Sequence, residues 1–407
     1  MALRAADQGM GVVGLDNNPS TVAALNAGRS HIDDVSDAEI ASALGNGYRA
    51  SADPKCIADA DVVVVCVPTP LSADGGPDLG PVEIAARTIG EHVTPGTLII
   101  LESTTYPGTT EEVFAPLVLS GGLALGTDVH IAFSPERIDP GNVTFGVANT
   151  PKVVGGLTPA CTQAARDFYA QFIDVVVEAK GAKEAEMAKL IENTFRHVNI
   201  ALVNEMVRFC HELDIDLWDA IDCAATKPFG FMAFRPGPGV GGHCIPVDPS
   251  YLSHRVKAQL GYAFRMVELA EEINHAAPLY VADRVRELLN EHRLAVNGAR
   301  VLLLGVTYKP DISDMRESPA VPLAQRLRAW GAEISYHDPF VPAWSPFGAE
   351  DVRLASVADP YEAGATADVV VLLQPHSSYD LPALAAASGR LLDTRAAVPA
   401  SDAVVRL

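Results

Sequence analysis

A single cysteine, Cys244, lies in a loop of glycine and proline that reads PGPGVGGHCIPVDP over residues 236–249. Gly241 and Gly242 have no side chains that would shield the sulfur, and they let backbone approach a ligand closely. Pro246 restricts the loop further. A free cysteine is more often a buried and inert thiol, which remains the alternative. The glycines favour an accessible thiol beside a bound ligand, and such a thiol is a candidate nucleophile.

A thiol of ordinary pKa is only a few per cent thiolate at pH 7, so a nucleophilic Cys244 needs a nearby cation or base. His243 is a poor candidate for that base, because adjacent side chains in extended backbone point to opposite faces. Asp248 follows four residues later and can hold a water molecule or a lysine.

The segment EMAKLIENTF, residues 186–195, predicts a helix on which Lys189 and Asn193 share a face because they are four residues apart. A helical lysine is usually a solvated surface charge. Here Met187, Leu190 and Ile191 are predicted to mark the buried flank of the helix, which would carry Lys189 and Asn193 inward.

Three loops follow or end apolar strand candidates: CVPTP at 66–70, ESTTYPGTT at 102–110 and SPERIDPG at 134–141. Ligands of open α/β sheets bind beyond the carboxyl ends of the strands, so we expect these loops to line one crevice. We expect Pro68, Thr69 and Ser103 to contact a cofactor. Thr104, which can also meet the cofactor, and Glu136 are expected near the reacting centre.

Asp16 closes the apolar run GVVGLD and suits the acidic residue that takes the ribose hydroxyls of a dinucleotide. That residue normally follows a G-x-G-x-x-G phosphate loop by about 20 residues, which here points to a position before Met1. We therefore expect the chain to start inside its first helix, without the first strand and the glycine loop. The alternative is an α/β domain that never had such a loop.

The elements that must position these residues form three parts. Short, continuously apolar runs, among them GVVGLD, TLIILES and KVVGG, alternate with helical stretches over residues 1–182, as in parallel strands that are buried on both faces. Residues 183–296 lose the strand signal and keep apolar residues at helical spacing. Strand candidates such as RVLLLGV return over 297–407. The prediction is an α/β protein with two Rossmann-like, doubly wound domains joined by a long-helix connector.

Composition excludes several classes of protein. Thirty Lys and Arg against 51 Asp and Glu give a net charge of −21, which argues against nucleic acid or an anionic membrane as partner. The six cysteines show no zinc-ligand spacing, so no metal is expected and the thiols should be reduced in a cytoplasmic protein. No run approaches the ~18 apolar residues of a membrane span.

The motifs together resemble the nucleotide-sugar 6-dehydrogenases, the UDP-glucose/GDP-mannose dehydrogenase superfamily, over essentially the whole chain. The strongest matches are PGPGVGGHCIPVDP, AKLIENTF and GVTYKPDISDMRESPA at 305–320, and HDPFV and LLDTR support them. Within the superfamily, GGHCIPVDP is similar to the UDP-N-acetylhexosamine branch. The expected absence of the glycine loop is a departure from the family pattern.

The resemblance implies a four-electron oxidation of a sugar C6 alcohol to a carboxylate with two NAD⁺ in succession. By this resemblance Cys244 is the nucleophile, and Lys189 and Asn193 stabilise the oxyanion. Asp248 and Thr104 organise the water molecule and the proton transfers. Glu136 can serve in hydrolysis. The resemblance also implies which residues bind the ligands. Arg316 is expected to contact the cofactor. The residues expected to contact the UDP-sugar come from the loops, the connector helix and the local cations: Glu136, Lys189, Asn193, Arg235, Gly241, Gly242 and Lys309.

Three functions remain open at this point. The first is UDP-N-acetylhexosamine 6-dehydrogenase, and the nearest alternative is UDP-glucose 6-dehydrogenase. A non-catalytic nucleotide-sugar binder is the alternative of another class. The resemblance also implies a homodimer formed through the connector helix.

Overall fold

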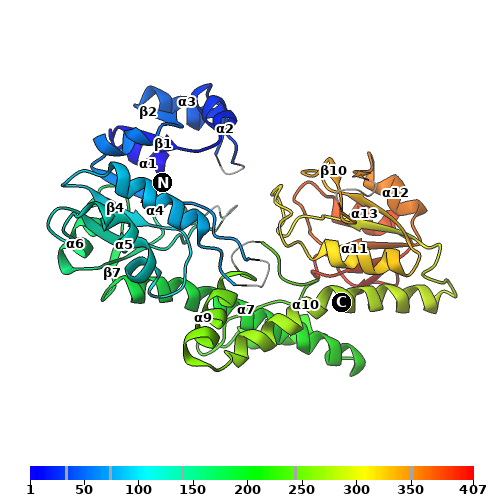
Figure 1. The fold of residues 1–407 in the computed structure, drawn as a ribbon. Coiled ribbons are helices and arrows are strands. Elements are labelled where there is room, and N and C mark those ends of the chain that lie inside the picture. Colours follow the sequence, from blue (N-terminus) through cyan, green and yellow to red (C-terminus); the bar gives the residue numbers. More distant parts are fainter. Residues whose placement is uncertain (33–34, 73–75, 140–141, 143, 243–244, 349–352) are drawn as a thin grey trace. The chain divides into compact units, whose positions relative to one another are not determined.

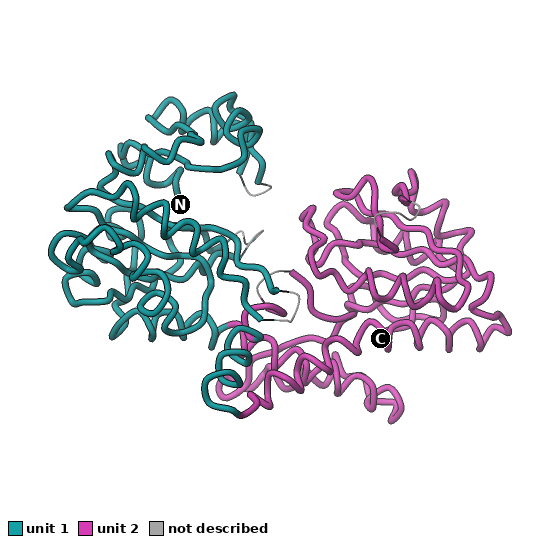
Figure 2. The backbone as a smooth tube through the Cα atoms, in the orientation of Figure 1, with its two compact units in different colours: residues 1–192, 250–261 teal, residues 193–249, 262–407 magenta. Residues whose placement is uncertain are grey.

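The computed structural model describes residues 1–32, 35–72, 76–139, 142, 144–242, 245–348 and 353–407. The chain divides into two compact units, which Figure 2 distinguishes by colour. Unit 1 comprises residues 1–192 and 250–261, and unit 2 comprises residues 193–249 and 262–407. Each unit contains parallel strands and the helices that cover them. Among the described residues no helix is both long and apolar enough to cross a membrane.

Unit 1 begins with a small lobe. Its parallel strands β1 (Val12–Leu15) and β2 (Tyr48–Ser51) form a two-stranded sheet. Helices α1 (Ala2–Asp7), α2 (Pro19–Asn26) and α3 (Asp37–Gly45) complete the lobe. A capping box between Ser36 and Glu39 starts α3, which satisfies backbone N–H groups that the helix itself leaves unpaired.

The larger sheet of unit 1, in which Figure 1 labels β4 and β7, has the strand order β3-β4-β5-β6-β7. The strands are β3 (Val62–Val65), β4 (Leu98–Leu101), β5 (His130–Phe133), β6 (Lys152–Gly156) and β7 (Val176–Glu178). Its helical segments are η1 (Pro54–Asp59), α4 (Gly80–His92), η2 (Thr110–Phe114), α5 (Ala115–Val118), η3 (Leu119–Gly121) and α6 (Pro159–Tyr169). Successive side chains of β4 alternate between two apolar clusters, so the sheet is buried on both faces.

One strand departs from the expected direction. The apolar run KVVGG suits a parallel strand, but β6 runs antiparallel to β5, with Ala132 opposite Gly156. A continuous apolar run marks burial on both faces and carries no information on direction, which depends on the connection between the strands.

Two long helices form the connector: α7 (Ala182–Glu212) and α10 (Arg265–Glu291). The shorter helices α8 (Leu217–Ala225) and α9 (Asp248–Leu260) lie between them in sequence. In unit 2, Val203 and Val207 of α7 share one apolar cluster with Val281 and Val285 of α10. The same cluster continues into the C-terminal sheet through Val301.

The sheet of unit 2 is parallel throughout, with the order β14-β13-β12-β8-β9. Its strands are β8 (Arg300–Leu304), β9 (Glu333–His337), β12 (Val369–Leu372), β13 (Leu391–Asp393) and β14 (Val404–Arg406). Helices α11 (Ala320–Ala329), α12 (Pro360–Thr366) and α13 (Leu381–Ala387) connect them, and β10 (Ala343–Trp344) pairs with β11 (Leu354–Ala355). The predicted fold class is confirmed: Rossmann-like sheets, parallel except at the β5–β6 pair, with a long helix between them in the chain.

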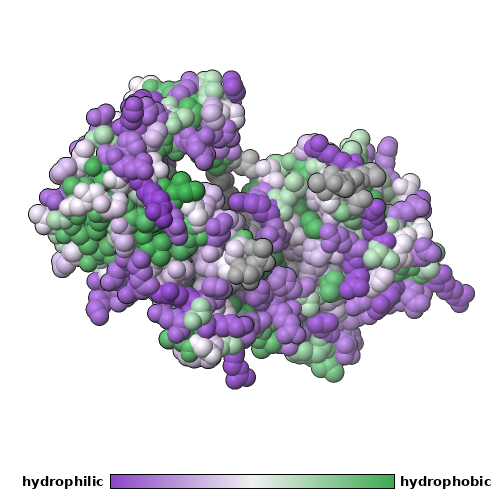
Figure 3. Space-filling view, viewed as in Figure 1, coloured by the Kyte–Doolittle hydropathy of each residue, from purple (hydrophilic) through white to green (hydrophobic). Residues whose placement is uncertain are grey.

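Hydrophilic residues cover most of the face drawn in Figure 3, and a hydrophobic patch lies over the part of unit 1 that contains α5.

Candidate active site

The predicted cofactor loops follow neighbouring parallel strands of unit 1. Residues 66–70 come after β3 and residues 102–104 come after β4, so both loops leave the same edge of the sheet. Ser103 joins them, because its Oγ donates a hydrogen bond to the Val67 carbonyl at 2.7 Å. The Thr69 side chain is buried and its carbonyl accepts a hydrogen bond from the Tyr251 hydroxyl of α9. Pro68 is exposed and Thr104 is half-buried beside this joined pair of loops.

A buried ion pair lies below these loops and was missed by sequence analysis. Glu102 and Lys152 are both nearly inaccessible, and Lys152 Nζ lies 2.7 Å from Glu102 Oε1. The Tyr169 hydroxyl donates to the same oxygen at 2.5 Å. Burial, and then the charge of Glu102, raise the pKa of Tyr169 well above its usual value. The available signal was a charged residue directly after the four fully buried residues of β4.

Lys189 is buried, as predicted. Its Nζ donates to the backbone carbonyl of Glu136 at 2.7 Å. The Glu136 carboxylate turns back onto its own loop, where Oε1 accepts the N–H groups of Arg137 at 2.7 Å and Ile138 at 2.6 Å. Lys189 therefore connects α7 to the loop after β5.

The expected buried flank of α7 was wrong at one position. Leu190 is fully buried, but Ile191 is 59% exposed. At 100° per residue Ile191 points away from the stripe that carries Glu186, Lys189 and Asn193. The buried stripe is therefore mixed polar and apolar, and α7 has a second apolar flank that is exposed.

Glu186 anchors the loop that follows Thr104. It is fully buried, and its carboxylate accepts hydrogen bonds from Gly108 N at 2.6 Å, from Thr110 N at 2.8 Å and from Thr110 Oγ1 at 2.6 Å. Thr105 Oγ1 lies 3.5 Å from the same carboxylate. Glu186 was not among the predicted site residues, although it lies three residues before Lys189 on the same helix.

In unit 2, Asn193 Nδ2 donates to Asp248 Oδ2 at 2.5 Å, and both side chains are buried. This pair of predicted residues is therefore brought together. Cys244, the predicted nucleophile, and His243 lie outside the described residues.

A chain of buried amides supports the glycine loop before Cys244. Asn204 Oδ1 of α7 accepts the Gly237 N–H at 2.9 Å, and Asn204 Nδ2 donates to Asn274 Oδ1 of α10 at 3.0 Å. Asn274 Nδ2 in turn donates to the His197 carbonyl at 3.2 Å. The loop is thus fixed to both connector helices by buried side chains.

Gly241 and Gly242 pack against the C-terminal sheet domain of unit 2. A Cβ on Gly241 would lie 2.6 Å from Tyr308 Cβ and 2.8 Å from the Glu317 carbonyl. Gly242 has φ +83°, and its N–H donates to the Arg316 carbonyl at 3.0 Å. A side chain at either position would displace the loop, so close packing also accounts for both glycines.

The predicted cations occupy different settings. Arg316 is exposed and forms a two-pronged ion pair with Asp314, with Nη2 2.7 Å from Oδ2. Arg235 is exposed and pairs with Asp222. Lys309 is half-buried in the loop after β8, and its carbonyl accepts the Thr307 hydroxyl at 2.9 Å.

Asp16 directly follows β1, as predicted, and its Oδ1 accepts the Asn18 N–H at 2.7 Å. Residues 9–14, GMGVVG, match the letters of G-x-G-x-x-G. They run from the end of α1 into β1, whereas a phosphate loop joins a strand to the helix that follows it. Residues 9–14 therefore cannot cradle a pyrophosphate in that manner.

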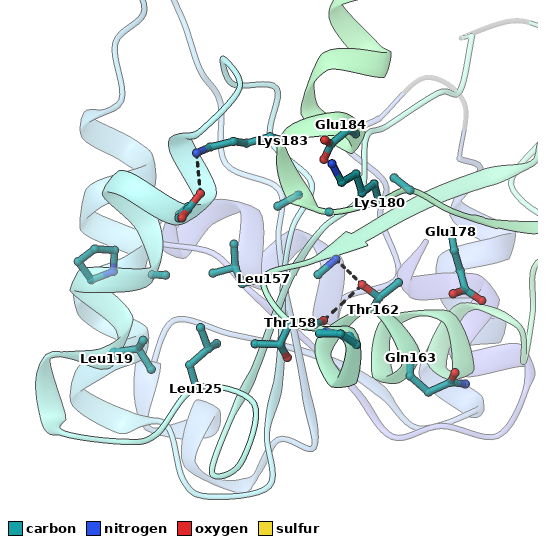
Figure 4. A pocket seen from close by; sticks show the side chains of 18 residues that line it. Leu119, Leu125, Leu157, Thr158, Thr162, Gln163, Glu178, Lys180, Lys183 and Glu184 are labelled. Atoms are coloured by element: carbon teal, nitrogen blue, oxygen red, sulfur yellow. Dashed lines mark hydrogen bonds and ion pairs between the residues drawn. The ribbon is translucent and has the colours of Figure 1, made fainter.

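A pocket of about 680 Å³ opens elsewhere in unit 1, between α5, the start of α6 and the start of α7 (Figure 4). Leu119, Leu125 and Leu157 line it, and Lys183 at its rim pairs with Glu111 at 2.7 Å. It contains none of the predicted site residues. Among the described residues no group of three or more His, Cys, Asp or Glu side chains is arranged to hold a metal ion.

Family models match three consecutive parts of the chain. Their descriptions are the NAD binding domain, the central domain and the UDP binding domain of the UDP-glucose/GDP-mannose dehydrogenase family, at residues 1–173, 183–276 and 302–400.

Characterised relatives cover most of the chain. A UDP-N-acetyl-D-mannosamine dehydrogenase of Escherichia coli K12 is 35% identical, and the match covers 90% of this chain and 88% of that protein. A UDP-N-acetyl-D-glucosamine 6-dehydrogenase of Pseudomonas aeruginosa is 37% identical, with 82% and 78% covered. The structure of a UDP-D-ManNAc dehydrogenase from Pyrococcus horikoshii aligns with a TM-score of 0.89 at 29% identity, covering 100% of this chain and 94% of that one.

Proposed function

Because the chain belongs to the UDP-glucose/GDP-mannose dehydrogenase family and is an NAD-dependent UDP-sugar dehydrogenase, we propose that it oxidises a UDP-N-acetylhexosamine at C6 to the uronic acid. The observation that carries this choice of sugar is the similarity to UDP-N-acetylhexosamine dehydrogenases over 90% and 82% of the chain.

The proposed reaction consumes one water and two NAD⁺ per sugar. The C6 alcohol loses a hydride and a proton and becomes an aldehyde. The Cys244 thiolate adds to the aldehyde carbon to form a thiohemiacetal, which loses a second hydride and becomes a thioester. Water then attacks the thioester, the carbon–sulfur bond breaks, and a carboxylate and the thiol are released. The products are one carboxylate, two NADH and three protons.

In this proposal, residues of the chain stabilise the developing negative charge and transfer protons. The Lys189 ammonium stabilises the oxygen that becomes negative during addition, and the Asn193 amide donates to it. Burial of both groups supports this role, because a charge interaction is stronger where water is excluded. Asp248 and Thr104 orient the attacking water and transfer its proton. Glu136, whose carbonyl holds Lys189, places the ammonium.

Each of the two NAD⁺, when bound, would accept one hydride. Asp16 fits the adenosine ribose because it directly follows β1. Within the described part of the chain, its carboxylate accepts a hydrogen bond through Oδ1 only, from the Asn18 N–H. Pro68, Thr69, Ser103 and Thr104 suit the nicotinamide end, because they share one edge of the sheet. We assign Arg316 to the cofactor and Arg235, Gly241, Gly242 and Lys309 to the UDP-sugar by resemblance.

Steady-state assays on a panel of UDP-sugars test the proposal. The expected result is that UDP-N-acetylglucosamine or UDP-N-acetylmannosamine gives a kcat/KM at least about fivefold above that of UDP-glucose, since a lost or misplaced polar contact to the sugar costs about 1 to 3 kcal/mol. An equal or higher kcat/KM with UDP-glucose would contradict the choice of sugar. Nucleotide-sugar binding without any reduction of NAD⁺ would favour a non-catalytic binder instead.

A further inference from the structure

Two loops of unit 2 flank the point where the chain changes direction across its sheet. Strand β8 lies between β9 and β12, so the chain leaves β8 toward one side and later returns to the other side at β12. Open parallel sheets bind ligands beyond the carboxyl ends of the strands at such a point. The loop after β8, residues 305–311, contains Lys309, and the loop after β12, residues 373–377, contains His376.

His376 is 1% exposed and bonds through both ring nitrogens. Its Nδ1 lies 2.9 Å from the backbone N of Asp311, and its Nε2 lies 3.1 Å from Asp338 Oδ2. A backbone N–H can only donate, so Nδ1 is the acceptor and Nε2 carries the hydrogen that Asp338 receives. The neutral ring in this tautomer therefore joins Asp311 to Asp338.

Asp338 extends this connection to the start of the first loop. The residue directly follows β9, is 2% exposed, and its Oδ2 also accepts the N–H groups of Val306 at 2.7 Å and Thr307 at 3.3 Å. Burial opposes ionisation of Asp338, but hydrogen bonds from His376 and from backbone N–H groups lower the pKa of this carboxyl below its usual value. His376 and Asp338 thus hold the 305–311 loop near both of its ends.

The middle and the end of the 305–311 loop are held by residues that flank His376 in the loop after β12. Gln374 Nε2, two residues before His376, donates to the Tyr308 carbonyl at 2.7 Å. Asp311 has φ +62°, a left-handed conformation that persists where surrounding contacts impose it, and its Oδ1 accepts the Ser377 N–H at 2.7 Å. The His376 ring also packs against Phe340 and Tyr379, with centroids 5.2 and 5.4 Å apart, and that packing does not need ring nitrogens.

We propose that His376 is a positioning residue for nucleotide binding, which with Asp338 fixes the 305–311 loop in the shape that presents Lys309 to the diphosphate of the substrate. The inference rests on the proposed function, because that function supplies the diphosphate. A preformed loop binds more tightly than one that must be ordered by its ligand. Loss of the ring nitrogens should therefore weaken binding of the nucleotide and leave the oxidation chemistry in place.

Calorimetric titration of the full-length protein with UDP tests this. His376→Phe keeps an aromatic ring without nitrogens and is expected to raise the UDP dissociation constant about tenfold, as loss of one or two buried hydrogen bonds would. His376→Asn retains an acceptor near the Nδ1 position and should fall between wild type and His376→Phe. The matched control is His337→Gln, which removes the imidazole that pairs with the Tyr379 hydroxyl at 3.0 Å and leaves the loop contacts intact. It should bind UDP within about twofold of wild type.

Steady-state kinetics separate positioning from general damage. The KM for the UDP-sugar should rise about tenfold in His376→Phe, whereas the KM for NAD⁺ and the kcat at saturation should stay within about twofold of wild type. Wild-type affinity for UDP in both His376 variants would overturn the inference while the proposed function stands. Absence of UDP binding by the wild-type protein would overturn the proposed function, and the inference with it.

Discussion

Lys189, Asn193 and Asp248 show how far single residues can be predicted from sequence. The i, i+4 spacing on an apolar helix predicted that Lys189 and Asn193 would be buried, and both are. Their actual partners, the Glu136 carbonyl and Asp248, come from segments more than 50 positions away in the chain. Local spacing specifies which face a residue occupies, whereas long-range partners depend on the tertiary fold, which explains why Lys152 and Tyr169 were missed.

His197 provides a residue-scale prediction on pH. Burial, and then the nearby His275, lower the pKa of His197 to about 4. In the unfolded chain the pKa is about 6.5, so the unfolded state takes up the proton first as pH falls. The stability contributed by neutral His197 is therefore complete above pH 6.5 and is lost as pH falls toward 4. The expected loss is about 3 kcal/mol at most.

Urea unfolding at several pH values measures this. His197→Gln should have a flatter dependence of the unfolding free energy on pH between 6.5 and 4 than wild type. The control is His31→Gln, the same substitution at an exposed position. Its unfolding free energy should depend on pH as that of the wild type does. Identical slopes for wild type and His197→Gln would mean that His197 does not titrate in this way.

At the scale of elements, apolar runs located most of the strands. GVVGLD, TLIILES and RVLLLGV became β1, β4 and β8 within a residue or two. Strand β2 was missed because YRAS is short and alternates in polarity, and it is defined by its pairing with β1. The direction of β6 was missed for a related reason: pairing geometry depends on the partner strand and on the connection to it.

Glu186 gives a prediction for the contact between α7 and the loop after β4. In Glu186→Gln an NH₂ group replaces one carboxylate oxygen and meets either the N–H group of Gly108, which donates to Oε2, or that of Thr110, which donates to Oε1. A buried donor left without an acceptor costs about 1 to 3 kcal/mol, so the free energy of unfolding should fall by about that amount. Because the loop continues from Thr104, kcat should fall as well.

The control for Glu186→Gln is Glu184→Gln, the same change two residues earlier on the same helix at an exposed position. Its unfolding free energy should stay within about 0.5 kcal/mol of wild type. Equal effects of the two substitutions on stability and kcat would show that Glu186 does not hold the loop.

At the scale of the whole molecule, the exposed apolar flank of α7 is a candidate interface between two copies of the chain. Phe195, Leu202 and Phe209 are 46%, 52% and 45% exposed and recur every seven residues. A seven-residue apolar repeat on a long helix is typical of a seam between helices. The opposite flank of α7 already packs in unit 2 through Val203 and Val207. We propose that the exposed seam pairs with its equivalent in a second copy, as expected for a homodimer.

Leu202→Lys tests the seam by placing a charge at its centre. Sedimentation at micromolar concentration should show a dimer for wild type and predominantly monomer for Leu202→Lys, since burial of an unpaired charge is costly. Arg196→Glu changes a charge on an exposed polar position of the same helix and should remain dimeric. A wild-type monomer, or a Leu202→Lys dimer, would contradict the proposed interface.

The central claim, that a thiohemiacetal on Cys244 links two hydride transfers and becomes a thioester in the second, is tested most directly by counting NADH per sugar. With limiting UDP-N-acetylhexosamine and excess NAD⁺, the wild-type enzyme should form two NADH and one carboxylate per sugar. Cys244→Ser should form no carboxylate, because a serine hydroxyl at ordinary pKa is a far weaker nucleophile toward the aldehyde, and should still bind the UDP-sugar. Two NADH and a full yield of carboxylate from Cys244→Ser would contradict the account.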